Sequence, residues 1–205
     1  MRSKTATALL FLFTLSGICT ADSWDPPSPI TVTSDDGAYR LTIYPRAIAS
    51  PRPDAHQQCD ATLEKLGPRS YELVWRKPFV NEVSPAYAAV TRSGQIVTFD
   101  NWHSLGLGDD AIVIYDKEGN LVRKLSLATL LGDEYFNKLP RSTSSVQWGS
   151  KYRLSLDEKS IVILVPNVGD HPSHKTINTD GSYRLIRLDI STGQLAPEPT
   201  DVHGI

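Results

Sequence analysis

The sequence predicts an all-β fold of antiparallel meanders with short helical inserts, and three observations lead to this prediction. The first is the stretch Val90–Leu127, in which three short runs rich in Val, Ile, Phe and Tyr alternate with polar turns. The second is that short apolar runs and turns continue at similar spacing through most of the chain. The third is a set of Asp–Gly turn motifs that recur between predicted strands.

The amino-terminal residues 1–21 have the pattern of a secretory signal peptide. Two basic residues come first, residues 8–15 form an apolar run too short to span a bilayer, and small residues precede a cleavage site at Ala21. An alternative is lipid attachment at Cys19, but Ile18 is larger than the residue that a lipobox places before its cysteine. We therefore expect a secreted or periplasmic protein that is cleaved near Ala21.

The mature chain has a mildly acidic charge, because removal of the leader changes the net charge from −2 to −4. Nucleic acids and anionic membranes bind basic surfaces, so we expect neither as a partner. After the leader, the sequence has no apolar run long enough for a transmembrane helix. Cys59 is the one cysteine left, so it is expected to be either buried or paired with a cysteine of another chain.

The amino-terminal part of the mature chain begins with a proline-rich extended lead-in at residues 22–29. Strands are predicted at residues 30–33, 39–44 and 71–75 from their alternation and their Val, Ile and Tyr content. Residues 60–66 are predicted to form a short helix, because an Asp stands at its start and a Gly-Pro pair follows it.

The central meander is predicted to have strands at residues 95–99, 111–115 and 121–125, the first of them beginning as early as Ala88. A polar, glycine-bearing loop connects the first two strands and a tight turn connects the last two. The apolar spacing then changes, and two short helical turns are predicted before and after Gly132.

The carboxy-terminal part is predicted to contain a hairpin of residues 152–156 and 161–165, followed by a strand at residues 183–190. Residues 196–205 contain two prolines and are expected to be a loose tail. Residues 30–195 are therefore expected to form a single β-rich domain, because a chain of this length can bury one core without disulfides.

Short motifs also recur along the chain. Asp36–Leu41 and Asp180–Leu185 share the pattern Asp-Gly-x-Tyr-Arg-Leu, while Asp116–Leu121 and Asp189–Leu195 share an Asp-to-Gly-to-Leu turn. Such units suggest blade-like meanders. Hairpin chemistry alone also explains them, since Gly takes the positive φ of a tight turn and Asp bonds to its own backbone.

Three segments carry a resemblance to a known family, namely Ser84–Pro85, Ser93–Thr98 and Ile112–Leu121. Through them the chain resembles the secreted bacterial β-propeller-like repeat proteins over about half of its length. The resemblance implies a propeller-like fold whose members mostly bind ligands or partners, while some are enzymes. At about 40–45 residues per blade the mature chain holds about four blades, so the propeller is expected to be incomplete or open.

The loop between the first two strands of the meander is the best candidate site. It gathers acids, an amide, an indole and an imidazole: Asp100, Asn101, Trp102, His103, Asp109 and Asp110. The carboxylates suit Ca²⁺, the imidazole suits general base catalysis, and the indole suits stacking on a sugar. The structural alternative is that Asp and Asn end strands, the glycines permit a wide turn, and the indole closes the end of the sheet.

A second candidate lies in a polar loop near the carboxy terminus. Asp170, His171 and His174 are close enough in sequence to hold a transition metal such as Zn²⁺. The loop has neither a cysteine partner nor a His-Glu-x-x-His frame, and a polar loop without metal explains the residues equally well.

These observations favour an exported, non-catalytic binding or interaction module whose partner is a protein, a glycan or a small ligand. One alternative is an exported metal-assisted hydrolase that uses His103 with Asp100 or Asp110. Another is a structural component of the cell envelope, joined to a second chain through Cys59. The usual serine-hydrolase elbow and the phosphate-binding glycine loop are absent from the sequence.

Overall fold

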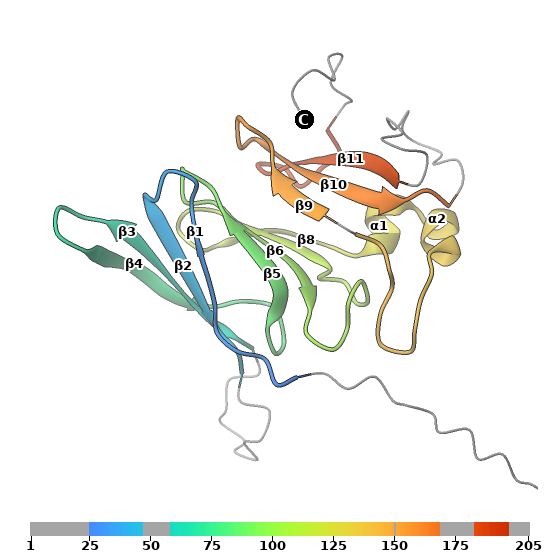
Figure 1. Ribbon diagram of the computed structural model, residues 1–205, viewed down its shortest axis with the longest axis horizontal. Coiled ribbons are helices and arrows are strands. Elements are labelled where there is room, and N and C mark those ends of the chain that lie inside the picture. The colour runs from blue at the N-terminus through green and yellow to red at the C-terminus, as the bar shows by residue number, and fades with distance from the viewer. Residues whose placement is uncertain (1–24, 47–57, 150, 169–182, 197–205) are drawn as a thin grey trace, which may run out of the picture.

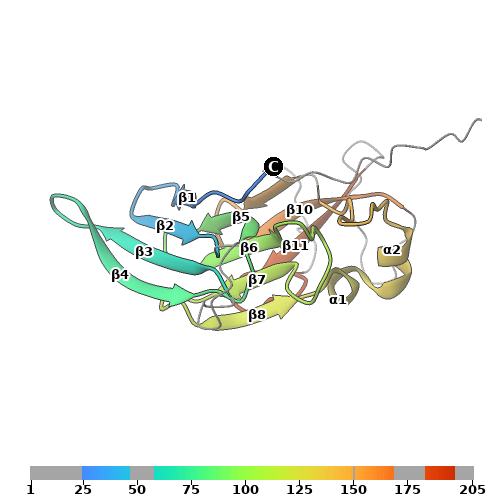
Figure 2. The same ribbon diagram turned by 90° about the horizontal axis from the view of Figure 1, so that it is seen from below.

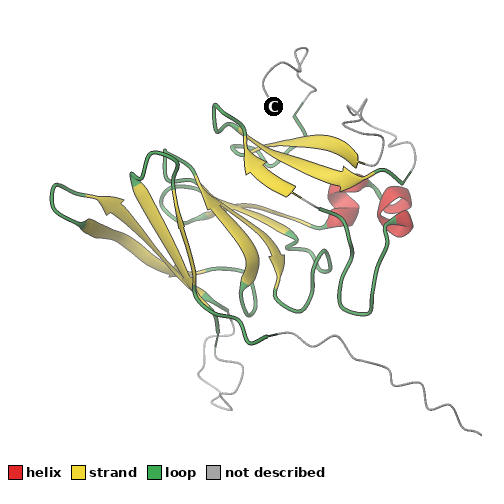
Figure 3. Ribbon diagram, viewed as in Figure 1, coloured by secondary structure: helices red, strands yellow, loops and turns green. Residues whose placement is uncertain are grey.

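The computed structural model describes residues 25–46, 58–149, 151–168 and 183–196. These residues form three antiparallel sheets and two short helices, so the predicted all-β class is confirmed (Figure 1). Each sheet is a meander in which strands that follow one another in sequence lie side by side. The helices, shown red in Figure 3, lie beside the third sheet. Neither helix within these ranges has the length and apolar character needed to cross a membrane.

The first sheet has four strands in sequence order. They are β1 (Ile30–Thr33), β2 (Tyr39–Tyr44), β3 (Asp60–Leu66) and β4 (Tyr71–Pro78). The predicted helix at residues 60–66 is wrong, because this segment is β3 and pairs with β2 on one side and β4 on the other. Ala61 and Leu63 alternate with polar residues and are fully buried, which is the period of a strand with one face on a core.

The second sheet also has four strands. They are β5 (Pro85–Val90), β6 (Ile96–Asn101), β7 (Ile112–Tyr115) and β8 (Leu121–Leu125). The prediction that the first meander strand runs on from Ala88 is wrong, because a turn separates β5 from β6. In that turn the Gly94 N–H donates to the Thr91 carbonyl over 2.9 Å, and Gly94 has a φ of 85°, which favours glycine.

The helices and the third sheet complete the described chain. Helix α1 (Leu127–Leu131) and helix α2 (Asp133–Lys138) are separated at Gly132, which confirms that prediction. The third sheet has the order β11 (Tyr183–Asp189), β10 (Ser160–Pro166) and β9 (Lys151–Leu154), and the predicted hairpin is its β9–β10 pair.

The second sheet lies between the first and third sheets (Figure 2), and two hydrophobic cores lie on its opposite faces. One core joins it to the first sheet, and the other joins it to the third sheet and both helices. Neighbouring residues on β6 point to opposite sides, so Ile96 belongs to the first core and Val97 to the second. All residues of β6 and β7 are consequently buried.

The three sheets share one turn design between their first two strands. In the first sheet the Ser34 Oγ accepts from the Tyr39 N–H at 3.0 Å. In the second sheet the Thr91 Oγ1 accepts from the Gln95 N–H at 2.9 Å. In the third sheet the Ser155 Oγ accepts from the Ser160 N–H at 3.1 Å. A hydroxyl at the first turn position therefore closes each hairpin, which is the structural repeat in this chain.

The two recurring sequence motifs differ in whether they occupy equivalent positions in the sheets. The three Tyr-Arg-Leu triplets lie on β2, β9 and β11, which are a second, a first and a third strand of their sheets, so they are not equivalent positions. The turns at Asp116 and Asp189 both follow the third strand of a sheet. In each of them the N–H of the glycine donates to the carbonyl of the aspartate.

Candidate functional site

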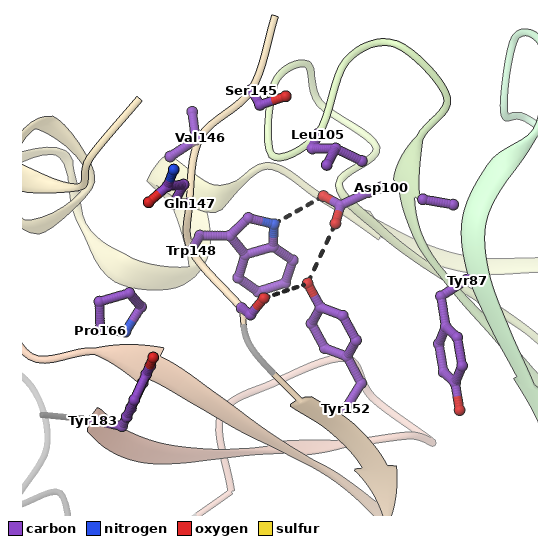
Figure 4. A pocket seen from close by; sticks show the side chains of 12 residues that line it. Tyr87, Asp100, Leu105, Ser145, Val146, Gln147, Trp148, Tyr152, Pro166 and Tyr183 are labelled. Carbon is purple, nitrogen blue, oxygen red and sulfur yellow. Dashed lines mark hydrogen bonds between the residues drawn. The ribbon is translucent and has the colours of Figure 1, made fainter. Parts of the chain in front are cut away.

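A cavity of about 510 Å³ lies between the second and third sheets (Figure 4). Four of its twelve lining residues are aromatic, namely Tyr87, Trp148, Tyr152 and Tyr183, and the carboxylate of Asp100 lies among them. Five parts of the chain supply these side chains. Strands β5, β6, β9 and β11 contribute one each, and the segment before β9 contributes the indole. The cavity thus depends on the packing of two sheets.

Asp100 is the last-but-one residue of β6 and is only 5% exposed. Its Oδ1 accepts from the Gly106 N–H at 2.7 Å and from the Trp148 Nε1–H at 2.8 Å. The Tyr152 hydroxyl donates to Oδ2 over a longer 3.3 Å. Burial raises the pKa of this carboxyl, and the three donors oppose that increase by stabilising the anion.

Tyr152 lies at the centre of the aromatic cluster. Its ring centroid is 4.4 Å from that of Phe99, 5.3 Å from that of Trp148 and 6.0 Å from that of Tyr87. These separations are in the range of favourable aromatic pairs. Burial, with the nearby charge of Asp100, raises the pKa of the Tyr152 hydroxyl, so this group stays protonated and acts as a donor.

The loop predicted as a site sends its polar side chains in different directions. Asp100 reaches the cavity, whereas Asn101 is buried in an amide network. The Asn81 Nδ2–H donates to the Asn101 Oδ1, and the Asn101 Nδ2–H donates to the Asp110 Oδ1, each over 2.8 Å. Desolvation by burial raises the pKa of Asp110. Asn101 and Asp110 thus hold the base of the loop together.

The remaining loop residues lie at the surface. Asp109 is exposed, and its Oδ2 lies 2.5 Å from the Lys124 Nζ, which lowers the pKa of Asp109. The Trp102 Nε1–H donates to the Asp25 carbonyl, and the Trp102 ring centroid lies 5.4 Å from that of His103. The chain reverses direction here because Asp100, His103 and two glycines have positive φ angles.

No metal centre emerges from these placements. In the part of the chain that the structure describes, no three or more His, Cys, Asp or Glu side chains come together in a way that could hold a metal ion. Asp170, His171 and His174 lie outside the described residues, so a metal site there stays a prediction. The same holds for Ca²⁺ or Zn²⁺ as a cofactor.

Cys59 is fully buried in the core between the first two sheets. Desolvation raises the pKa of its thiol to about 12, so the thiol is protonated at neutral pH. Of the two alternatives considered for this cysteine, burial is the one that the structure shows. A disulfide with a second chain would require this core to open locally.

No pattern in the sequence connects the aromatic residues of the cavity with Asp100. Trp148 and Tyr152 are four residues apart and lie about fifty positions after Asp100, and no spacing rule links such segments. One usable sign was present, namely an acid that directly follows the mostly apolar run Ile96–Phe99. A buried carboxylate requires donors, and indole and phenol groups are suitable ones.

Comparison with known proteins adds little to this description. No protein-family model matches the chain, and no curated protein matches it. A crystal structure of a protein from Lactobacillus plantarum is similar with a TM-score of 0.40 and 12% sequence identity. The match covers 83% of this chain and 40% of that one, so the chain spans less than half the length of that protein. The cavity between the second and third sheets therefore has to support any functional proposal.

Proposed function

We propose that the protein is an exported, non-catalytic binding module that holds a small ligand in the cavity between the second and third sheets. The observation that carries the proposal is the aromatic lining of a cavity of about 510 Å³ around a single carboxylate. Ligand sites of small molecules are typically concave, mostly apolar and of this volume, with few polar groups that set orientation. Aromatic faces suit a ligand with a flat or compact apolar surface.

Binding fits the cavity better than catalysis does. The Asp100 Oδ1 already accepts two N–H donors, and none of the described residues around the cavity is a histidine, lysine or cysteine. The Tyr152 hydroxyl contacts Asp100 Oδ2 only over a long 3.3 Å, and its raised pKa keeps it protonated, so the pair is not an activated nucleophile. The hydrolase alternative needs His103 to act with Asp100 or Asp110. His103 is exposed, whereas Asp100 is buried beside Trp148 and Asp110 accepts from Asn101.

We further propose that the three sheets are successive blades of an open, propeller-like arrangement. Strands β1 and β5 contact each other, and Tyr87 on β5 stacks on Tyr152 on β9, so the first strands of the sheets are neighbours. The shared hydroxyl-closed turn supports the same view, because it recurs between the first two strands of each sheet. Meander sheets arranged in this way resemble the blades expected from the sequence.

Export is the part of the proposal that depends on the leader alone. We expect the mature chain to begin at Asp22, because the small residues before it form a signal-peptidase site. Intact mass measurement of the protein secreted by a bacterial host tests this. A mass that begins at an acylated Cys19 would instead show lipid anchoring, and an uncleaved chain would contradict export.

Binding in the cavity is tested with two tyrosines of matched exposure. Tyr87 lines the cavity and is 44% exposed, whereas Tyr44 lies on β2 outside it and is 42% exposed. We expect saturation-transfer NMR to detect at least one of the probes indole, methyl glucoside and choline on the wild-type protein. Tyr87→Ala should weaken that binding about tenfold, because it removes an aromatic wall, while Tyr44→Ala should leave it unchanged.

Two results of this comparison would contradict the proposal. Failure of every probe to bind the folded wild-type protein would remove the cavity as a ligand site. Equal losses in Tyr87→Ala and Tyr44→Ala would show that the probes bind elsewhere or non-specifically. Both substitutions are at partly exposed positions, so both variants are expected to fold, which circular dichroism checks.

A further inference from the structure

Asp100 differs from the other well-buried acid of the described chain in having no cationic partner. The Glu158 side chain is 8% exposed, and its Oε1 lies 3.0 Å from the Arg92 Nε, so its charge is compensated. Asp100 is as deeply buried, yet the hydrogen bonds that it accepts from the described residues all come from neutral donors. A buried charge without a counter-charge destabilises a folded protein.

The second oxygen of Asp100 retains capacity to accept a donor. A carboxylate offers about four acceptor positions, and Oδ1 already uses two of its own on Gly106 and Trp148. Oδ2 receives only the long 3.3 Å bond from the Tyr152 hydroxyl, which also lies 3.4 Å from the Gly149 carbonyl. Figure 4 shows this oxygen directed toward Tyr152 at the cavity. A ligand that carries a positive charge would meet it there.

The walls around this oxygen are suited to a cation as well. Indole and phenol rings attract a cation placed over their faces within about 6 Å of the centroid, indole most strongly. Trp148 and Tyr152 both line the cavity, and their ring centroids are 5.3 Å apart. Tyr183 and Tyr87 add two further rings to the lining. The described lining residues include no lysine or arginine that would repel a positively charged ligand.

We infer that the cavity binds an organic cation, an alkylated or protonated amine whose charged group lies near Asp100 Oδ2 and among the aromatic rings. This inference rests on the proposed binding function and specifies its ligand class. The aromatic rings supply the apolar contacts, and the ligand supplies the positive charge that the described residues around Asp100 do not provide. A neutral sugar or a neutral aromatic compound would leave that charge uncompensated.

The test compares choline with its uncharged carbon isostere, dimethylbutanol, by isothermal titration calorimetry on the wild-type protein. The two molecules have nearly the same shape and differ in charge, so the ratio of their affinities isolates the charge. We expect choline to bind at least about tenfold more tightly. This comparison needs no substitution and so does not depend on a variant that folds.

The Asp100→Asn variant gives a second measurement with little change of shape. The amide oxygen can accept from Gly106 and Trp148 as Oδ1 does, and the amide nitrogen can donate to the Tyr152 hydroxyl oxygen. We expect about a tenfold loss of choline affinity in this variant and no change for dimethylbutanol. Tyr87→Phe, which keeps a ring face, should retain choline binding, whereas Tyr87→Ala should weaken it.

The outcomes separate this inference from the proposed function. Equal binding of choline and dimethylbutanol, unaffected by Asp100→Asn but weakened by Tyr87→Ala, would overturn the cation and leave the cavity as a neutral ligand site. Binding of neither compound, with none of the other probes bound, would overturn both. Tighter binding of choline that Asp100→Asn reduces would support both.

Discussion

Replacement of Asp100 by alanine is expected to lower the free energy of unfolding by about 3–4 kcal/mol. The substitution leaves the Gly106 N–H and the Trp148 Nε1–H buried without an acceptor, and it releases the Tyr152 hydroxyl from Oδ2. Each unsatisfied buried donor costs about 1–3 kcal/mol. Urea denaturation monitored by fluorescence measures the loss of free energy of unfolding. An unchanged dependence of this free energy on urea concentration shows that the two proteins can be compared as two-state systems.

Asp100→Asn is the matched control for this loss. It keeps an acceptor for both N–H donors and removes the buried charge, so we expect its free energy of unfolding to lie within about 1 kcal/mol of the wild-type value. Equal destabilisation by alanine and asparagine would show that the charge, and not the acceptor, stabilises the fold. A loss below about 1 kcal/mol for alanine would show that water replaces the carboxylate.

Gly106→Ala is expected to be the second strongly destabilising change, with a loss of about 2–4 kcal/mol. Gly106 has a φ of 69°, and an added Cβ would lie 2.7 Å from the Trp148 Cδ1 and 2.9 Å from the Leu127 Cδ1. The variant therefore combines backbone strain with a clash against two buried side chains. It also disturbs the N–H that Asp100 accepts.

Gly37→Ala separates the two contributions to this loss. Gly37 has nearly the same φ, 71°, but an added Cβ would meet no atom within 4 Å. We expect it to lose about 1 kcal/mol, which is the cost of the left-handed backbone for a residue with a side chain. Thermal and urea unfolding of both variants check the difference. Equal losses would contradict the close packing of Gly106 against Trp148.

Most strands were predictable from local alternation, whereas β3 was not. The segment at residues 60–66 begins with a good helix cap, and its Leu63 and Leu66 are three apart, so its pattern suits a helix turn as well as a strand. Pairing with β2 and β4 selects the strand over the helix. β2 ends at Tyr44, well before β3 begins at Asp60. Long-range pairing of this kind leaves no local mark in the sequence.

The candidate site was predictable in one residue only. The sequence indicated that residues 100–110 form a polar loop, but not that the positive φ of Asp100 turns its side chain toward the third sheet. Its partners Trp148 and Tyr152 come after both helices in the sequence, so they are distant from Asp100 along the chain. The cavity arises from the packing of two sheets, which depends on the burial of both cores rather than on any motif.

The burial of β6 and β7 on both faces has a consequence for how the molecule unfolds. Each outer sheet shares its core with the middle one, so neither outer sheet keeps a complete core when the middle one opens. We expect the edge strands β4 and β8 to fray separately, whereas β6 contributes residues to both cores, so its loss would disrupt both. We therefore expect the three sheets to unfold as one cooperative unit, and the Asp100 carboxylate lies near the end of the strand that joins their cores.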